Sequence, residues 1–349
     1  MGKDLGMTKL RLPAAFLLLA LLAVCCGKDG TTAHFLFVTN AEWSPASAGE
    51  ILISRQEYDV RQGYSSGCAS EATDDPAPLP AYDLWFADTS GKTTRRLTTT
   101  GPLTAAAHFE WSHAGDRLLV WDNSRPFFAT MDTNGSFIRY DSIPYVSDAD
   151  YAPDGSTIVT SAVRLSGVFP RLYLLPSSGA GGLVPIGPAL QAGAVAWSPA
   201  DLIAFTCIDT NGTRLALIHP NGSGLTFIDS AAGFFNLRFS PDGSTLLYTR
   251  KVSSLAQDVV FYDVAGASQR LFLQFSDGTQ ILSLRWSPDG TMISYYARQA
   301  TNVFVLYVIN ADGTDARQVA QLSTDATWSP DSRRVAYVYY NKLYTRTLR

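Results

Sequence analysis

Two short motifs alternate along this chain, and their spacing limits what it can fold into more than any other feature. The first motif is an aromatic residue followed by Ser-Pro-Asp-Gly, which is complete at 239–243 and 286–290. The second is a four-residue polar segment that ends in glycine, as at 132–135 and 310–313. With degenerate copies included, the aromatic positions are Trp43, Trp111, Tyr151, Trp197, Phe239, Trp286 and Trp328, and the glycines are Gly91, Gly135, Gly179, Gly222, Gly266 and Gly313.

Both motifs have the chemistry of tight turns. Proline fixes φ for a turn, aspartate accepts hydrogen bonds from nearby backbone amides, and glycine adopts φ > 0 without steric cost. From Trp111 onward the aromatic positions are 40 to 47 residues apart, and a β-rich run follows each of them. Two hairpin turns in each period predict four strands per period, which is the pattern of a β-propeller blade.

The number of periods predicts seven blades. Trp43 and the six later aromatic residues would end seven inner strands. The chain ends before a seventh outer strand, so we expect His34–Thr39 to close the ring beside the C-terminal strands and to cover the open sheet edges. The alternative is six blades, with His34–Thr39 as a second strand and 40–81 as a long insertion. Seven blades are favoured because they leave no strand unassigned.

The paired motifs resemble the TolB-like propeller repeats, which are relatives of the WD-repeat blades. The resemblance covers nearly all of the chain after its leader. It implies an all-β propeller and a general role in binding, and it implies no catalytic residue. The chain departs from TolB itself because no α/β domain precedes the propeller and because seven blades are expected rather than six, so the partners of TolB are not transferred.

The N-terminus has the pattern of an export signal. Three basic residues precede an apolar run at 12–24, which has the length of a secretory core and is short for a membrane span. The run leads into Leu22-Ala23-Val24-Cys25, which resembles a bacterial lipobox. We therefore predict a lipoprotein signal peptide at 1–24 and acylation of Cys25, with Cys26 as the alternative acceptor. An ordinary signal peptide cleaved nearby is the other interpretation.

The rest of the chain is expected to be one domain on a tether. The tether is 25–33 and the propeller is 34–349, with an insertion at 56–81 in the first blade. The net charge of −4 offers no basic surface for nucleic acid. We expect a monomer in the cell envelope whose lipid anchor is its only membrane attachment. In a cell with two membranes we expect the outer membrane, because neither candidate cysteine is followed by aspartate.

The variable loops are the expected binding face. If the strands of a blade are lettered A to D from the central channel outward, the A–B and C–D turns lie on one face and the B–C and D–A loops on the other. Binding residues on repeat scaffolds gather on variable loops. Cations near the ends of second strands could attract an anionic partner, although solvated loop residues are the plainer interpretation. The predicted partner-binding residues are Arg125, Arg164, Arg250 and Arg298.

Catalytic and metal-binding patterns are weak. The four histidines are scattered and lack the spacing of a zinc site. The segment 63–67 has the letters of a nucleophile elbow without the α/β context that this motif requires. We therefore predict no catalytic residue and no cofactor, with Ca²⁺ held by channel carboxylates as an unsupported alternative. Cys68 and Cys207 could pair, but a pairing cannot be read from sequence.

Together these observations predict a non-enzymatic, lipid-anchored, extracytoplasmic β-propeller that binds an envelope protein or a peptide. The alternative is a small-molecule or metal-dependent site, of the kind found in propeller lactonases, at the mouth of the channel.

Overall fold

The computed structural model describes residues 32–61, 83–98, 107–122, 127–140, 143, 145–163 and 169–348. The chain divides into two compact units, 1–35 with 58–75, and 36–57 with 76–349. The described part of the first unit is limited to the beginning of β1 (Thr32–Trp43) and the end of β2 (Ile51–Arg61). Within the described ranges, no helix has the length and apolarity needed to cross a bilayer.

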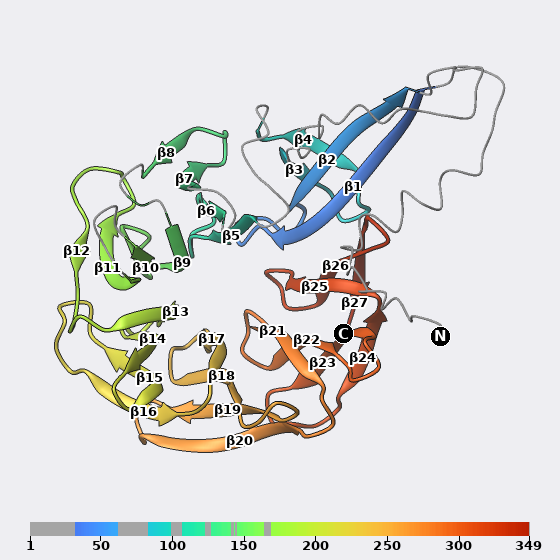
Figure 1. Cartoon of the computed structure of the whole chain (residues 1–349). Coiled ribbons are helices and arrows are strands. Elements are labelled where there is room, and N and C mark those ends of the chain that lie inside the picture. Colours follow the sequence, from blue (N-terminus) through green and yellow to red (C-terminus); the bar gives the residue numbers. More distant parts are fainter. Residues whose placement is uncertain are drawn as a thin grey trace, which may run out of the picture. The chain divides into compact units, whose positions relative to one another are not determined.

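Seven sheets follow one another around a ring in the second unit, which confirms the seven-bladed, all-β prediction (Figure 1). The inner strands are β1, β5 (Ala107–Trp111), β9 (Tyr145–Tyr151), β13 (Gln191–Trp197), β17 (Phe234–Phe239), β21 (Gln280–Trp286) and β25 (Ser323–Trp328). The second strands are β2, β6 (Arg117–Asp122), β10 (Thr157–Val163), β14 (Ile203–Asp209), β18 (Thr245–Lys251), β22 (Met292–Arg298) and β26 (Arg334–Tyr339).

Two further layers of strands lie outside these. The third strands are β3 (Asp83–Ala87), β7 (Phe127–Asp132), β11 (Arg171–Pro176), β15 (Gly212–Ile218), β19 (Gln257–Asp263), β23 (Phe304–Asn310) and β27 (Lys342–Thr347). The outer strands are β4 (Thr93–Arg96), β8 (Phe137–Arg139), β12 (Val184–Pro185), β16 (Thr226–Ser230), β20 (Ser268–Phe275) and β24 (Arg317–Gln321).

The turn predictions are confirmed, because each of the seven aromatic residues ends an inner strand and the second motif joins third strands to outer strands. In the fifth blade the Ser240 hydroxyl donates to Asp242 Oδ1 over 2.6 Å, and its oxygen accepts from the Thr245 amide over 3.0 Å. The Ser240 hydrogen bond holds the pKa of Asp242 below its usual value. Gly243 has φ of 73°, and a Cβ there would lie 2.7 Å from Ser198 Oγ of the fourth blade. Glycine is therefore required for both conformation and space.

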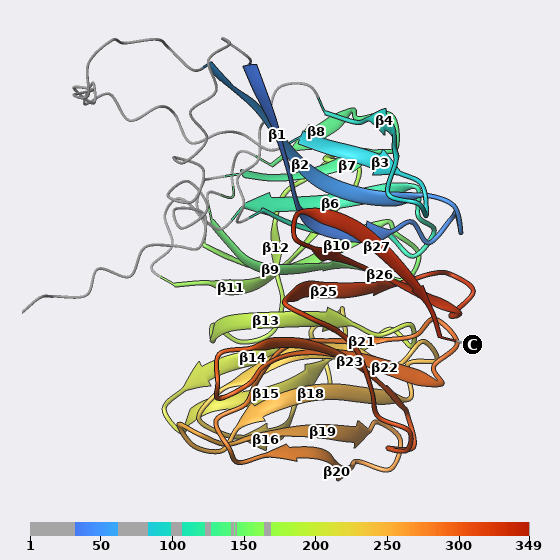
Figure 2. The same cartoon turned by 90° about the vertical axis from the view of Figure 1, so that its right-hand side faces the viewer.

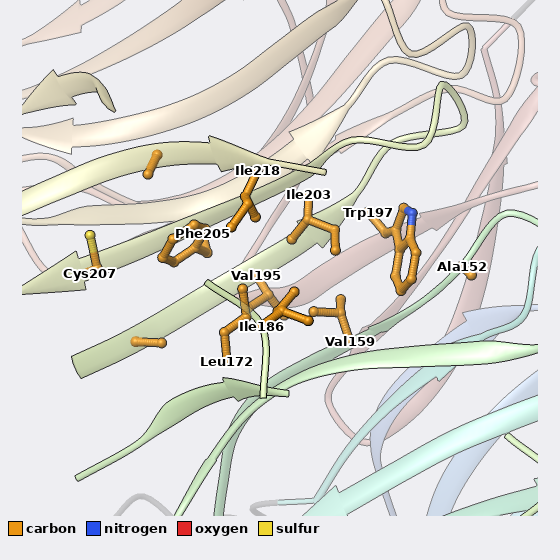
Figure 3. Close-up of a cluster of buried hydrophobic side chains, with 12 residues drawn as sticks. Ala152, Val159, Leu172, Ile186, Val195, Trp197, Ile203, Phe205, Cys207 and Ile218 are labelled. Atoms are coloured by element: carbon orange, nitrogen blue, oxygen red, sulfur yellow. The ribbon is translucent and has the colours of Figure 1, made fainter. Parts of the chain in front are cut away.

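The hydrophobic core lies between successive blades. Trp197 and Phe205 of the fourth blade pack in one cluster with Val159 and Leu172 of the third (Figure 3). Trp197 is 5% exposed, which confirms that this regularly spaced tryptophan is a core residue. Trp286 is only partly buried and stacks on Phe261 of the fifth blade, with ring centroids 5.5 Å apart.

The predicted closing strand is wrong. His34–Thr39 belongs to β1, which lies next to β2 in the first blade, and within the described residues the last sheet has three strands, β25, β26 and β27. The physical reason is that neither glycine nor proline interrupts 32–43, so the β conformation continues from His34 through to Trp43 as one strand.

Side-chain contacts join the last blade to the first instead. A shared core contains Trp43 and Ile51 of the first blade and Ala336 and Val338 of the seventh. The Arg334 guanidinium lies 4.9 Å from the centroid of a Trp43 ring and donates to the Ala48 carbonyl over 3.0 Å.

An ion pair also links the sixth blade to the first. Arg285 of β21 pairs with Glu42 of β1, and its Nη1 lies 3.0 Å from Glu42 Oε2. Between them, Thr327 of β25 donates its hydroxyl to the same carboxylate over 3.2 Å and accepts from the Trp43 amide over 2.9 Å. The junction is therefore tied by three successive inner strands.

We predict that Glu42→Gln lowers the free energy of unfolding by about 2 kcal/mol, because it leaves a largely buried guanidinium without its charge partner. Asp315→Asn is the matched control, since its exposed pair with Arg317 should be worth less than about 1 kcal/mol. Urea unfolding of the purified proteins measures both values. Equal losses in the two variants would contradict this account of ring closure.

Candidate functional site

The residue before the aromatic position lines the channel in five of the blades. In blade order the residues at this position are Glu42, Glu110, Asp150, Ala196, Arg238, Arg285 and Thr327. Five of them line a cavity of about 530 Å³ that the inner strands enclose, and the exceptions are Ala196 and Thr327. His108, Asp148, Asn236 and Ser283, two residues further toward the loop face, line the same cavity.

The charges in this channel cavity are segregated by blade. The first three blades contribute the carboxylates and the fifth and sixth contribute the arginines. Glu42 and Arg285 neutralise one another. Across the described residues, neither Glu110 nor Arg238 forms an ion pair, and Arg238 Nη1 donates only to the Leu237 carbonyl, over 2.9 Å. Three carboxylates therefore face one arginine outside the Glu42–Arg285 pair.

Asp148 and Asp150 connect neighbouring blades. Asp148 Oδ2 accepts from the Val195 amide over 3.0 Å, and Asp150 Oδ2 accepts from the Trp197 amide over 2.7 Å. The other oxygen of each carboxyl accepts from the next amide of its own strand, β9. Both aspartates lie on the inner strand and not in the loop before it, because β9 begins already at Tyr145.

Burial raises the pKa of both carboxyls. The pKa of Asp148 rises to about 6, mainly by desolvation and against the opposing attraction of Arg238. The pKa of Asp150 rises to about 7, because desolvation is reinforced by repulsion from Glu110. Both aspartates therefore change charge near neutral pH.

Beside the channel, bulges on the inner strands shape a groove on the loop face. Pairing with the second strand shifts register between Ala192 and Val195, between Phe235 and Arg238, and between Ile281 and Ser283. Asn236 has φ of 58° within its bulge. Bulges redirect side chains, and here the bulged segments and the loop at 252–256 line a groove of about 640 Å³.

The groove is apolar where it meets solvent. Phe235 is 46% exposed, Leu255 is 63% exposed and Leu282 is 42% exposed. The backbone holds its rim, since the Gly278 amide donates to the Leu255 carbonyl over 2.9 Å. Asn236 and Leu282 line both the groove and the channel cavity, so the two spaces are adjacent.

Of the sequence-predicted arginines, the two that the structure describes, Arg250 and Arg298, line neither space. Arg250 Nη2 lies 3.0 Å from Asp258 Oδ2, and its Nη1 lies 3.3 Å from Asp229 Oδ2, so two carboxylates compensate its charge. Arg298 donates to Gln280. Arg125 and Arg164 lie outside the described residues.

The cysteine predictions are only partly within the described chain. Cys25, Cys26 and Cys68 lie outside it, as does the predicted insertion beyond Arg61, where β2 ends. Cys207 is a free, buried thiol on β14, and burial raises its pKa to about 11.

A second hollow lies on the opposite, turn face, between the fifth and sixth blades. Figure 2 views the ring of sheets from its side. It measures about 730 Å³ and includes Asp242, Asp263 and Asp289 in its lining. Each of these carboxylates already accepts hydrogen bonds within its own turn. The hollow therefore offers a ligand fewer uncommitted polar groups than the channel does.

Among the residues with described positions, no group of three or more histidine, cysteine, aspartate or glutamate side chains is arranged to hold a metal ion. The only carboxylate pair on one channel strand, Asp148 and Asp150, is already bound to backbone amides.

Comparison with known proteins finds similarity at the level of the fold. No protein-family profile matches the chain, and no curated sequence matches it. An oligogalacturonate lyase in complex with manganese superposes with a TM-score of 0.63 at 15% identity, covering 90% of this chain and 91% of that one. The protein assigned as TolB from Agrobacterium tumefaciens superposes with a TM-score of 0.55 at 18% identity, covering 74% of this chain and 95% of that one. The Cps50 (Swd1) β-propeller domain from Myceliophteria thermophila superposes with a TM-score of 0.62 at 13% identity, covering 91% of this chain and 98% of that one.

These neighbours include an enzyme and non-enzymatic propellers, and their identities lie between 13% and 18%. The likeness establishes the β-propeller fold alone, and it carries no activity across to this chain.

We predict opposite pKa changes for two channel variants. Glu110→Gln should lower the pKa of Asp150 from about 7, because it removes the repelling charge, and Arg238→Gln should raise it by removing the attracting one. Carboxyl NMR titration of the purified protein measures both shifts. A shift in the same direction for the two variants would contradict the arrangement of charges described above.

The same groups predict how stability depends on pH. Their pKa values lie above the ordinary 3.8, so between about pH 4 and pH 7 the folded chain holds protons that the unfolded chain releases. The contribution of these carboxyls to the free energy of unfolding therefore falls as pH rises through that window. Glu110→Gln should make the fall smaller, which urea unfolding at several pH values would reveal.

Proposed function

We propose that this protein is a non-enzymatic scaffold of the bacterial cell envelope that binds an extended peptide segment of another envelope protein on its loop face. The observation that carries this proposal is the apolar groove formed by the bulged segments of β13, β17 and β21 and the loop at 252–256.

Apolar side chains of a peptide would gain most from this surface. Phe235, Leu255 and Leu282 are each more than 40% exposed and lie along one groove. Covering an exposed leucine or phenylalanine is worth about 1 to 2 kcal/mol. Three such contacts supply a useful share of the affinity of a peptide in the micromolar range, which needs about 8 kcal/mol.

The charge of the groove favours a particular partner. Lys251 is the one charged residue in the described lining, which holds no carboxylate, on a protein with a net charge of −4. A peptide with apolar side chains and an acidic residue near Lys251 therefore complements the surface. Recognition of extended segments in grooves is a common mode of peptide binding.

The proposed location follows from the leader. A signal peptide at 1–24 with an acylated Cys25, or Cys26, would anchor the protein to the envelope membrane through the tether at 25–33. Such an anchor would keep a monomeric propeller close to membrane-associated partners.

The competing function is a metal-dependent enzyme, since one structural neighbour is a lyase in complex with manganese. We favour the scaffold because three exposed apolar side chains, Phe235, Leu255 and Leu282, lie along the groove. Titration of the purified protein with Mn²⁺ and Ca²⁺ separates the two functions, since stoichiometric binding would favour the enzyme.

A photo-crosslinking residue in place of Leu255 should capture a defined partner segment in the native envelope. Val184 is the matched control position, because it is 58% exposed but lies on an outer strand of the third blade. Mass spectrometry of the crosslinked peptide should identify one recurring sequence at position 255. Adding Leu282→Asp should reduce its yield about tenfold or more by placing a charge in the apolar groove. The same segment captured equally from both positions would refute the groove as the binding site.

Cys25→Ser should release the protein from the membrane fraction and abolish incorporation of a labelled fatty acid. Cys26→Ser should leave both unchanged, because acylation at Cys25 makes that residue the mature N-terminus. Retention of label in the first variant and loss in the second would assign the anchor to Cys26. Retention in both would show that neither cysteine is the acceptor.

A further inference from the structure

The channel cavity has no role in the proposed apolar contacts, yet charged side chains from five blades line it. Outside the Glu42–Arg285 pair, its lining contains Glu110, Asp148 and Asp150 against Arg238 alone. We propose that this cavity binds a cationic group, an ammonium or a guanidinium, carried by a ligand that enters from the loop face.

The carboxylates are held in place before any ligand arrives. The two aspartates are fixed by backbone amides of β13 at 3.0 and 2.7 Å, and by amides of their own strand. Each carboxylate oxygen has a second lone pair that these bonds leave unused. Glu110 lies on the neighbouring β5 and forms no ion pair within the described residues. Preorganised acceptors of this kind lower the cost of ordering a bound donor.

The electrostatic balance favours a cation. Burial and the repulsion from Glu110 disfavour the ionised form of Asp150, so its charge is held at a cost that a bound cation would relieve. Arg238 attracts both aspartates without forming a salt bridge with either. The other ionisable groups that line the cavity are His108, Tyr296 and the neutralised Glu42–Arg285 pair. None of them supplies an uncompensated positive charge, since burial lowers the pKa of His108.

Aromatic side chains provide an independent indication of a ligand. Trp121 lines the cavity, is 5% exposed, and its indole Nε1 has no hydrogen-bond partner. Its ring lies nearly parallel to that of His108, with centroids 5.3 Å apart. Tyr296 adds a third ring to the lining. Aromatic faces attract guanidinium and ammonium groups. The unpaired indole N–H is a donor, so it would be completed by a carbonyl oxygen of the ligand that carries the cation, not by the cationic group itself.

This inference deepens the proposed function, because Asn236 and Leu282 line both spaces and a peptide in the groove could direct a basic side chain into the channel. The cation site nevertheless has a test of its own. The probe is N-acetyl-arginine amide, which carries the guanidinium without apolar neighbours, and N-acetyl-citrulline amide is its uncharged match.

Calorimetric titration of the purified protein should show binding of the arginine probe and at least about tenfold weaker binding of the citrulline probe. Glu110→Gln should weaken binding of the arginine probe by a similar factor. Arg238→Gln should strengthen binding of the arginine probe severalfold, an increase that structural damage alone would not produce. Asp315→Asn, on the exposed surface, should leave the affinity unchanged.

Three results would overturn the inference: equal affinity for the two probes, weaker binding in Arg238→Gln, or preferential binding of N-acetyl-glutamate amide. Binding of the arginine probe without any partner captured at position 255 would retain the cation site and reject the peptide groove. Capture at position 255 without binding of the arginine probe would retain the peptide groove and reject the cation site.

Discussion

Burial of each blade against the next is the constraint on which this structure depends. A four-stranded sheet has two faces, and in this ring the apolar side chains of one blade are covered by those of its neighbour, as Trp197 covers Val159. The aromatic residue that ends each inner strand belongs to this packing. Because side chains alternate along a strand, the residue before the aromatic residue points to the opposite side of the strand, and in five blades it lines the channel cavity.

The channel cavity therefore collects side chains from most of the blades without any local motif for a site. Six of the seven inner strands contribute to the lining of a single cavity, and β25 does not. Charges gathered in this way cost free energy of folding unless ion pairs or hydrogen bonds compensate them. Glu42 and Arg285 use theirs to join the first and sixth blades, and Asp148 and Asp150 use their oxygens to bind backbone amides of the next blade. Glu110 and Arg238 have no such role, so their charges are available to a ligand.

Much of the fold could be predicted from the sequence, because turn chemistry is local. Proline, aspartate and glycine at fixed offsets specify a turn whatever surrounds them, so the strands and the count of seven blades followed from the repeats. The closure could not be read in this way, since whether His34 continues into the strand that ends at Trp43 depends on pairing with β2.

The site was harder to predict than the fold. The arginines singled out in the loops were judged by charge alone, whereas the contact of Arg250 with two aspartates arises from the tertiary structure. The channel residues did leave a signal in the sequence. The residue before each aromatic position reads Glu, Glu, Asp, Ala, Arg, Arg, Thr in blade order, and aligning the repeats on the aromatic residue would have revealed the segregation of charge.

We propose that ligands bind where the groove meets the channel on the loop face. Hydrogen–deuterium exchange of the protein with and without the crosslinked partner peptide tests it most directly, because exchange reports on backbone amides of both faces at once. The account predicts slower exchange at 233–237, 251–256 and 278–282, with no change in the Ser-Pro-Asp-Gly turns at 240–243 and 287–290. Protection confined to those turns would place the ligand on the opposite face and contradict the account.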